Sequence, residues 1–535
     1  MISFWSLRHT IAIACIAALQ LSDPFVLAQE GAGVSGPTTV TTGYSCDPAK
    51  CKLPACYCPS TKPPGGLDPK NIPQLITLSK CCCGQIETWQ SAGRRNEFSL
   101  VFVCSLMNAP MRSVCIAFDD SINEVILPQI LNYTSDYTNP NGCPLAATFF
   151  ISTQNISQNG HFNGHVNRMY SSGHEIATHT INHVGDPPLG EMSGAVQAVS
   201  AFGGVPLSKL VGFRTPFLLY SRNTYANLIT AGTFKYDSSM PMNYGAIPAW
   251  PYTLDNGPYT QCSGGTCVAP FNFPGLWEIP MYMLLNADGT ENAAMDPDPL
   301  PKATPGPMPA SDIFDLLKTN FNNRYTSTRL PLGIYLHAAV AVTQPNYITG
   351  VRMFMDWIRS SGHNDVYWVS NQQLLAWMQN PTDIAGSVTN PALDCLMPAV
   401  NPSNAEVCDG IDNNGNGQID EGLTESCYYP ALQASFTSCF GCPTTIPNVT
   451  NPVPFTGPRT RKSIPSAGCP NGGTWNPISG TCVNLARQAK VIPKNSTGSG
   501  SSAKGAGNSA DSPSQWRVVS LIVTLATLFF VGMAV

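Results

Sequence analysis

Short apolar segments recur between Pro73 and about Pro381, and polar residues gather at the carboxyl end of each segment. The segments read PQLITL, AATFFIS, HEIATH, LVGFRTPF, FKYDSS, LWEIPM, LGIYLHA and VYWVS, and loops and amphipathic stretches separate them. Apolar strands that alternate with helices build parallel α/β folds, in which active sites form at the carboxyl ends of the strands. We therefore predict one α/β domain over residues 73–391, with its functional residues at those ends.

The length and charge of the chain limit its class. Its 535 residues suffice for one large domain of about 250 to 350 residues with appendages. Only 11% of the residues are charged, and the formal net charge is -5. Such a chain has no basic field that would attract nucleic acid, so we predict a neutral partner and no nucleic-acid binding.

Both ends of the sequence carry targeting signals. Residues 1–28 have a cationic start, an apolar run and small residues at the end, which predicts a secretory signal peptide, with a signal anchor as the alternative. A Gly/Ser/Ala stalk at 495–517 precedes the apolar residues 518–535. This is typical of a GPI attachment signal, with the lipid attached within 505–510; a single transmembrane helix is the alternative. Either reading predicts an extracellular protein at the cell surface, held at the membrane or cell wall.

Twenty cysteines in an exported chain predict disulfide bonds. Within residues 29–72, four form a compact cluster that we expect to pair as two local bridges, with a metal knuckle as the alternative: Cys46, Cys51, Cys56 and Cys58. Within residues 392–494, six cysteines are scattered from Cys408 to Cys482 and indicate a small disulfide-held tail module. Glycosylation sequons agree with export, at Asn132, Asn155, Asn448 and Asn495.

Two short motifs are suited to binding a metal. HTINH places His179 and His183 four residues apart, so both can reach one ion if the segment turns helically at a strand end. Solvent-exposed or hydrogen-bonding histidines are the alternative. In FDD, Asp119 and Asp120 follow an apolar run. Adjacent carboxylates need a compensating charge, which a divalent metal would supply while leaving one aspartate as a base.

Three further residues follow apolar segments: Arg214 in RTPF, Asp237 in YDSS and His337 in LHA. Each alone could be an ion pair or a core residue. With FDD and HTINH, and in this order, they resemble the five motifs of the polysaccharide deacetylase family, the carbohydrate esterases that include chitin deacetylases. The resemblance covers residues 73–381. It implies an α/β fold, a distorted parallel (β/α) barrel of seven or eight strands, here with small disulfide-rich N- and C-terminal extensions.

The resemblance also implies roles for these residues. Asp120, His179 and His183 would hold one divalent metal, with zinc the first choice and cobalt or another divalent ion the alternative. Asp119 would take the proton from the attacking water. The activity implied is hydrolysis of N-acetyl groups in a polymer of N-acetylglucosamine, with chitin deacetylation to chitosan as the leading expectation.

Other family roles fall on residues around the metal. The backbone N–H of Phe217, which stands where the family has Tyr, would stabilise the oxyanion. His337 would protonate the departing amine, and Asp237 would orient His337 and favour its protonated form. Arg214 would keep the catalytic base ionised, and Trp250 could stack on a sugar ring. Two alternatives stay open: a catalytically degenerate polysaccharide-binding protein that organises the wall, and a deacetylase acting on O-acetylated xylan or on peptidoglycan.

The segment before FDD departs from the family. The family has a threonine there, directly after a strand, whereas this chain has Ala117 and the strand-like PQLITL ends far upstream. Codons for the two ends of this segment can spell splice signals. Removal of the sequence between these signals would join Leu78 through one threonine to Phe118. We interpret residues 79–116 as a translated, retained intron. A genuine surface insertion is the alternative, with SVCIAF as the strand end.

The cysteine count agrees with the intron hypothesis. Without Cys15 of the signal and five cysteines of the segment, fourteen of the twenty remain, and an even number can all pair.

The tail contains VCDGIDNNGNGQIDEG, which resembles a calcium-binding loop with oxygen ligands at alternating positions: Asp412, Asn414, Asn416 and Asp420. Leu423 occupies the twelfth position, so a full EF-hand is not expected. We predict a shorter Asp/Asn-rich calcium motif. A plain Asn/Gly turn loop held by Cys408 and Cys427 is the alternative.

Overall fold

The computed structural model describes part of the chain. The described residues are 36–81, 126–134, 136–153, 162–245, 247–262, 267, 269–297, 308–337, 340, 344–396, 406, 420, 422–429, 434–439, 441–454, 474–476 and 481–483. The chain divides into two compact units, Met1–Ala489 and Lys490–Val535, and all described residues belong to the first. Several predicted features lie outside the described residues: the signal at 1–28, Asp119, Asp120, Asp412, Asn414, Asn416, the stalk at 495–517 and the apolar tail at 518–535. Among the described helices, none is both long enough and apolar enough to cross a membrane.

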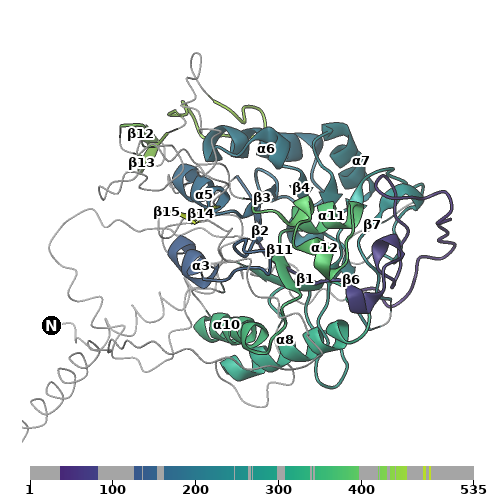
Figure 1. Cartoon of the computed structure of the whole chain (residues 1–535). Helices are drawn as coiled ribbons and strands as arrows, with labels where there is room; N and C mark the ends of the chain where they lie inside the picture. Colours follow the sequence, from purple (N-terminus) through teal and green to yellow (C-terminus); the bar gives the residue numbers. More distant parts are fainter. Residues whose placement is uncertain are drawn as a thin grey trace, which may run out of the picture. The chain divides into compact units, whose positions relative to one another are not determined.

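A mainly parallel sheet forms the centre of the domain (Figure 1). Its strands follow one another in space as β10 (Leu332–His337), β1 (Gln74–Cys81), β2 (Thr148–Ile151), β3 (Glu175–Thr178), β4 (Gly212–Phe213), β5 (Tyr236–Asp237), β8 (Trp277–Glu278) and β7 (Tyr252–Thr253). β11 (Val366–Val369) also pairs with β1. Only the β7–β8 pair of this sheet is antiparallel, so the predicted parallel α/β architecture is confirmed.

Closure of the sheet into a barrel is not seen. Among the described strands, no ladder joins β7 back to β10, and the sheet counts nine strands rather than the predicted seven or eight. A separate parallel pair consists of β6 (Pro241–Met242) and β9 (Met281–Tyr282). Several strands here are only two residues long, so each can make few ladder hydrogen bonds.

The two faces of the sheet pack into different cores. Leu75 and Phe150 belong to one cluster of buried residues, here called the inner cluster. Their neighbours Ile76 and Phe149 belong to the other, here called the helix-side cluster. Because successive side chains of a strand point to opposite faces, cluster membership shows which face each strand residue occupies.

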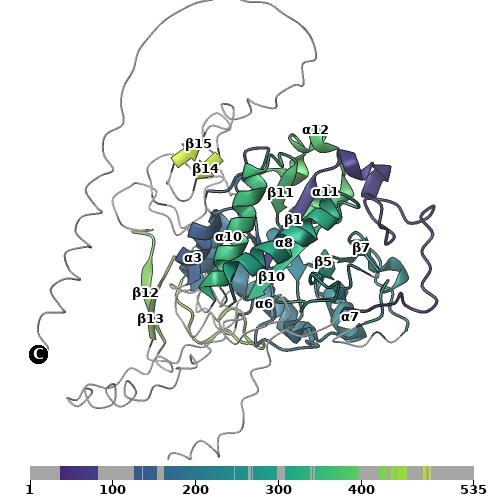
Figure 2. The same cartoon turned by 90° about the horizontal axis from the view of Figure 1, so that it is seen from below.

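Helices cover the helix-side cluster. The packed helices are α3 (Ile126–Thr134), α5 (Phe162–Ser171), α6 (Leu189–Gly203), α7 (Arg222–Ala231), α8 (Ala310–Tyr325) and α10 (Pro345–Ser360). Figure 1 shows α6 and α7 on one side of the strands and α8 and α10 on the opposite side. Figure 2 shows α8 and α10 beside each other over β1 and β10. α11 (Asn371–Gln379) contributes to the inner cluster instead, and the short α12 (Ile384–Ser387) follows it.

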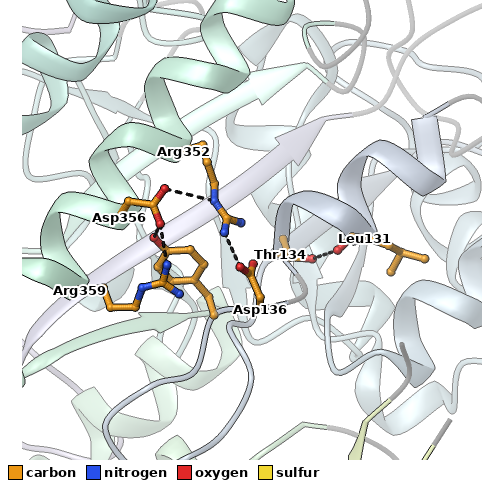
Figure 3. A network of polar contacts seen from close by, with 7 residues as sticks. Leu131, Thr134, Asp136, Arg352, Asp356 and Arg359 are labelled. Atoms are coloured by element: carbon orange, nitrogen blue, oxygen red, sulfur yellow. Dashed lines mark hydrogen bonds and ion pairs between the residues drawn. The ribbon is translucent and has the colours of Figure 1, made fainter. Parts of the chain in front are cut away.

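A network of ion pairs holds α10 against the chain just after α3 (Figure 3). Arg352 Nη2 lies 2.5 Å from Asp136 Oδ2, and Tyr137 donates a 2.9 Å hydrogen bond to Asp356. The guanidinium groups of Arg352 and Arg359 lie 4.8 and 4.9 Å from the Tyr137 ring centroid. The hydrogen bond from Arg352 lowers the pKa of the Asp136 carboxyl. The network therefore depends on an ionised aspartate.

Disulfides fasten the parts that flank the sheet. Cys46–Cys58 and Cys51–Cys56 confirm the two local bridges predicted for the N-terminal cluster. Three of these sulfurs lie within 4.8 Å of one another, but they are consumed in disulfides and offer no thiolate to a metal. Three further bridges are Cys143–Cys395, Cys262–Cys267 and Cys427–Cys442.

The tail contains two hairpins among its described residues. β12 (Glu425–Tyr429) pairs with β13 (Ala434–Ser438), and β14 (Thr474–Asn476) pairs with β15 (Thr481–Val483). Cys427, one of the two cysteines expected to hold the Asn/Gly loop in the alternative interpretation, bonds to Cys442, and Cys408 lies outside the described residues.

Candidate active site

Three of the predicted site residues lie at the carboxyl ends of strands of the central sheet. His179 directly follows β3, Arg214 follows β4, and His337 is the last residue of β10. In the sheet, only β1 and β2 separate β10 from β3, and β4 follows β3. The parallel register therefore brings residues that are distant in sequence to one edge of the sheet, as predicted.

His179 is fixed in the form that a metal ligand requires. Its backbone N–H donates to the Ile151 carbonyl at 2.9 Å, which continues the ladder from β2. Its Nδ1 lies 2.8 Å from the Arg214 carbonyl oxygen, and the side chain is 1% exposed. A carbonyl oxygen can only accept, so Nδ1 carries the hydrogen and the lone pair lies on Nε2. The residues present fit a divalent metal, because the His183 ring centroid lies only 5.1 Å from that of His179.

The turns that carry the site are strained. Thr180 and His183 have φ of 70° and 54°, and Phe217 and Leu218 have φ of 58° and 52°. This left-handed region is unfavourable for residues with a Cβ, and most of all for a β-branched one such as Thr180. Such strain persists where surrounding contacts determine the backbone, and it concentrates at functional sites.

The partner of His337 is Asp296, not the predicted Asp237. Asp296 Oδ1 accepts a 2.8 Å hydrogen bond from the His337 backbone N–H, and its Oδ2 contacts His337 Nδ1. The side chains of His337 and Asp296 are 10% and 6% exposed. Asp296 lies in a proline-rich loop between β9 and α8, away from the end of any apolar segment. The sequence offered no signal for it beyond an acidic residue among prolines.

Asp237 fails to reach His337 because it points to the other face of the sheet. Tyr236 belongs to the inner cluster, so the next residue faces the helices. In β10, Leu336 belongs to the helix-side cluster, so His337 faces inward. The Asp237 carboxylate accepts instead from the Tyr225 hydroxyl of α7 at 2.7 Å.

Asp237 supports the site indirectly. It accepts from the Ser239 hydroxyl at 2.7 Å, and that oxygen accepts from the Thr215 backbone N–H at 2.8 Å, in the loop after β4. Burial raises the pKa of Asp237, and it raises the pKa of neighbouring Glu278 well above its usual value, with the Asp237 charge adding to the effect. Burial therefore disfavours the charged form of both carboxyl groups, and of Glu278 most of all.

Arg214 is buried and aimed toward β1 and β2. It is 0% exposed, its Nε donates to the Ser238 carbonyl at 2.7 Å, and its guanidinium lies 4.1 Å from the Phe150 ring centroid. Phe150 pairs in register with Cys81 of β1. The predicted contact with Asp119 concerns a residue outside those described and stays a prediction.

Trp250 does not offer a sugar platform. Its side chain is 0% exposed and stacks on Trp377 with ring centroids 5.8 Å apart. The stacking prediction is therefore wrong: the WPY segment is part of the inner cluster. Apolar surface beside the histidines comes instead from Val184, Phe217 and Leu219, which are 36, 38 and 48% exposed. The Phe217 ring packs edge-on against His183 at 4.6 Å.

The calcium prediction touches the described residues only at Asp420. Its backbone N–H donates to Glu406 Oε2 at 3.0 Å, and its φ is 53°. The other three predicted ligands lie outside the described part of the chain.

Comparisons with known proteins point to one family. A polysaccharide deacetylase family model matches residues 107–233, which contain the FDD, HTINH and RTPF motifs. A model of a metal-binding motif matches residues 396–421 of the tail.

Two relatives are silkworm (Bombyx mori) proteins named as chitin deacetylases. Chitin deacetylase 1 is 27% identical over 355 residues, covering 63% of this chain and 57% of the relative. The chain thus spans less than two thirds of that protein. Chitin deacetylase 8 is 26% identical over 428 residues, covering 78% of this chain and 95% of the relative.

Similar solved structures include Puue allantoinase, with 17% identity, a TM-score of 0.35 and coverage of 59% of this chain and 93% of that one. Another is a family 4 carbohydrate esterase from Streptomyces lividans in complex with acetate. It has 13% identity, a TM-score of 0.24 and coverage of 46% of this chain and 86% of that one.

Proposed function

We propose that this chain is a metal-dependent hydrolase of the polysaccharide deacetylase family, which removes acetyl groups from N-acetylglucosamine residues of a polysaccharide, with chitin as substrate. The observation that carries the proposal is the pairing of two histidine arrangements at one sheet edge. His179 Nδ1 contacts the Arg214 carbonyl while its ring lies beside that of His183, and His337 Nδ1 contacts Asp296.

Asp120, His179 and His183 would hold the metal, by a donor set of one carboxylate and two imidazoles that suits zinc. When bound, a divalent metal supplies Lewis-acid polarisation of the acetyl carbonyl and a more acidic water. The Arg214 carbonyl keeps His179 in the required tautomer. The packing of Phe217 against His183 restricts the second ring.

Asp119 accepts the proton of the attacking water, and the guanidinium of Arg214 keeps this carboxylate ionised. Attack on the acetamide carbon creates an oxyanion, to which the Phe217 backbone N–H donates. His337 then gives the proton on Nε2 to the departing amine while the C–N bond breaks. Asp296 accepts from Nδ1 throughout and so stabilises the imidazolium before transfer.

We propose further that the active form lacks most of the segment before FDD. In β1, Cys81 pairs with His337 on one side and with Phe150 on the other. If one threonine replaces residues 79–117, Asp119 takes the place of Cys81. Paired residues of neighbouring strands project to the same face. Asp119 would then point inward beside His337 and near Arg214, as a proton acceptor must.

One observation favours the alternative. The family model's match begins at residue 107, inside the segment, so SVCIAF can serve as the strand before FDD in the complete chain. The two forms are compared by expressing the chain as written and the chain with Leu78 joined through threonine to Phe118. Acetate release from chitin oligomers is measured with and without a chelator.

We expect chelator-sensitive release from the shortened form and little from the complete chain. Equal release from both forms would refute the intron hypothesis. No release from either form with metal supplied would refute the deacetylase and favour a catalytically degenerate wall-organising protein. Release from O-acetylated xylan or peptidoglycan but not from chitin would reassign the substrate.

We also propose that the protein acts outside the cell, attached to the surface by a lipid anchor, and that the tail binds calcium. The five disulfides among the described residues support an oxidising compartment. The match of a metal-binding motif model to residues 396–421 supports the tail site. Release of the protein from intact cells by a phosphatidylinositol-specific phospholipase tests the anchor, and calcium titration of the isolated full chain tests the tail.

A further inference from the structure

The turn between the two metal-binding histidines is held by a carboxylate from the next helix. Glu191 lies in the first turn of α6, and its side chain reaches back over the HTINH segment. Its Oε2 accepts from the backbone N–H groups of Ile181 at 3.0 Å and Asn182 at 2.8 Å. Its Oε1 accepts from Asn182 Nδ2 at 2.8 Å. Glu191 is 5% exposed, so these contacts take the place of water.

Ile181 and Asn182 lie between the strained residues Thr180 and His183. Left to itself, a turn with two left-handed residues that carry a Cβ would relax, since each costs about 1–3 kcal/mol. Hydrogen bonds from N–H groups to a buried carboxylate are stronger than those to neutral acceptors. The three contacts of Glu191 therefore oppose that relaxation and set the direction in which His183 leaves the turn.

A second contact from α6 acts on the same turn. The Ile181 side chain is 0% exposed, and its Cδ1 lies 2.4 Å from where a Cβ on Gly194 would be. A methyl group at position 194 would force the end of the Ile181 side chain to move. Two residues of α6 therefore contact the turn: Glu191 through its carboxylate, and Gly194 through close packing with Ile181.

We propose that Glu191 is a positioning residue of the metal site, which sets the spacing of the His179 and His183 rings and so the affinity for the metal. The proposal rests on the proposed function, because it assigns the two histidines to a divalent metal. Glu191 touches neither substrate nor metal and acts through the backbone of the turn.

The test measures metal binding, not turnover. Cobalt(II) is titrated into the metal-free protein, in whichever of the two forms binds it, and the visible absorption of the bound ion reports its coordination geometry. Loss of a group that orients a metal ligand weakens affinity by roughly 10–100-fold. We expect Glu191→Ala to raise the cobalt Kd by that factor and to change the shape of the absorption band.

Glu191→Gln should retain most of the affinity, with less than about a tenfold loss, because the amide oxygen can accept from both backbone N–H groups. Gly194→Ala should also weaken binding, since a methyl group there displaces Ile181. These two variants separate loss of the contacts from loss of the charge alone.

The matched control is Arg352→Ala, which removes ion pairs of the α3–α10 network and lowers stability far from the histidines. All variants are compared at a temperature where each is folded by circular dichroism. The proposal is overturned if Glu191→Ala binds cobalt as the unaltered protein does, or if Arg352→Ala weakens binding equally. Absence of cobalt binding by the unaltered protein in both forms would overturn the proposed metal-dependent function, and this inference with it.

Discussion

The contact between Asp296 and His337 makes a quantitative prediction about proton transfer. Asp296→Asn keeps the size of the side chain and can keep the acceptor for the His337 backbone N–H. It replaces the carboxylate oxygen at Nδ1 with an amide, which either donates to Nδ1 or accepts from it as a neutral group. In both arrangements the protonated imidazole loses its negative partner.

The size of the effect follows from the bond that is lost. A hydrogen bond to a charged group contributes about 1.5–3 kcal/mol, and each 1.36 kcal/mol corresponds to about a tenfold change in rate. We therefore expect kcat to fall about 10- to 150-fold. KM should change little, because the proton leaves His337 only in the chemical step. The alkaline limb of the kcat profile should move to lower pH, since the imidazolium is less stabilised.

The assay is acetate release from chitin oligomers at saturating and limiting substrate, from about pH 5 to 10. Asp288→Asn is the matched control, because Asp288 is exposed in the same loop and, among the described residues, accepts hydrogen bonds from its near neighbour Thr290. That variant should keep the unaltered kcat and pH profile. An Asp296→Asn variant with unchanged kcat and profile would show that His337 does not depend on this carboxylate.

Three further predictions concern stability. Burial raises the pKa of Glu278 above its value in the unfolded chain, so its contribution is present at low pH and is lost as pH rises. The melting temperature of the unaltered protein should therefore fall relative to that of Glu278→Gln between pH 4 and 8, and a constant difference would contradict this. Arg324 is buried over the Tyr244 ring, and two of its nitrogens have no hydrogen-bond partner among the described residues. Arg324→Met should therefore leave the free energy of unfolding unchanged or raise it by up to about 2 kcal/mol. A lower free energy of unfolding would show that the stacking on Tyr244 dominates. The Cys143–Cys395 disulfide spans 252 residues. Replacing both cysteines with serine should lower the free energy of unfolding by about 4–5 kcal/mol in denaturant titrations. A decrease of less than about 1 kcal/mol would show that this disulfide does not stabilise the fold by restricting the unfolded chain.

The pattern of apolar segments was sufficient to predict the strand ends that carry the site. Buried parallel strands read as continuous apolar runs, and polar residues directly after them must lie at the same edge. This rule places His179, Arg214 and His337 at one edge of the sheet, and in the structure each lies at the carboxyl end of a strand of the same sheet. The closeness of the cysteines in the N-terminal cluster was likewise enough to predict local bridges.

Contacts that depend on a loop were not predictable. Asp296 reaches His337 from a segment without periodicity, with its own backbone at φ 46° and its N–H bonded to the Tyr335 carbonyl. No local pattern encodes such a placement, because it depends on where β10 lies. The burial of Trp250 also depends on a distant segment. A tryptophan beside a motif can face the sugar or the core, and Trp250 lies in the core because it stacks on Trp377 of α11.

Asp237 shows that a position at a strand end does not by itself predict which face of the sheet a residue occupies. Asp237 and His337 are each the last residue of a strand, so position along the strand does not separate them. The alternation of side chains along the strand separates them. Tyr236, before Asp237, belongs to the inner cluster, whereas Leu336, before His337, belongs to the helix-side cluster. The last residues of two strands at the same sheet edge can therefore lie on opposite faces of the sheet. Asp237, on the helix side, contacts the loop after β4 through Ser239. The carboxylate beside His337 comes instead from Asp296 in a loop. Variants at the two aspartates should accordingly differ in kind, with Asp296→Asn lowering kcat at unchanged stability and Asp237→Asn lowering the melting temperature first. If both variants changed only kcat, the assignment of faces would be wrong.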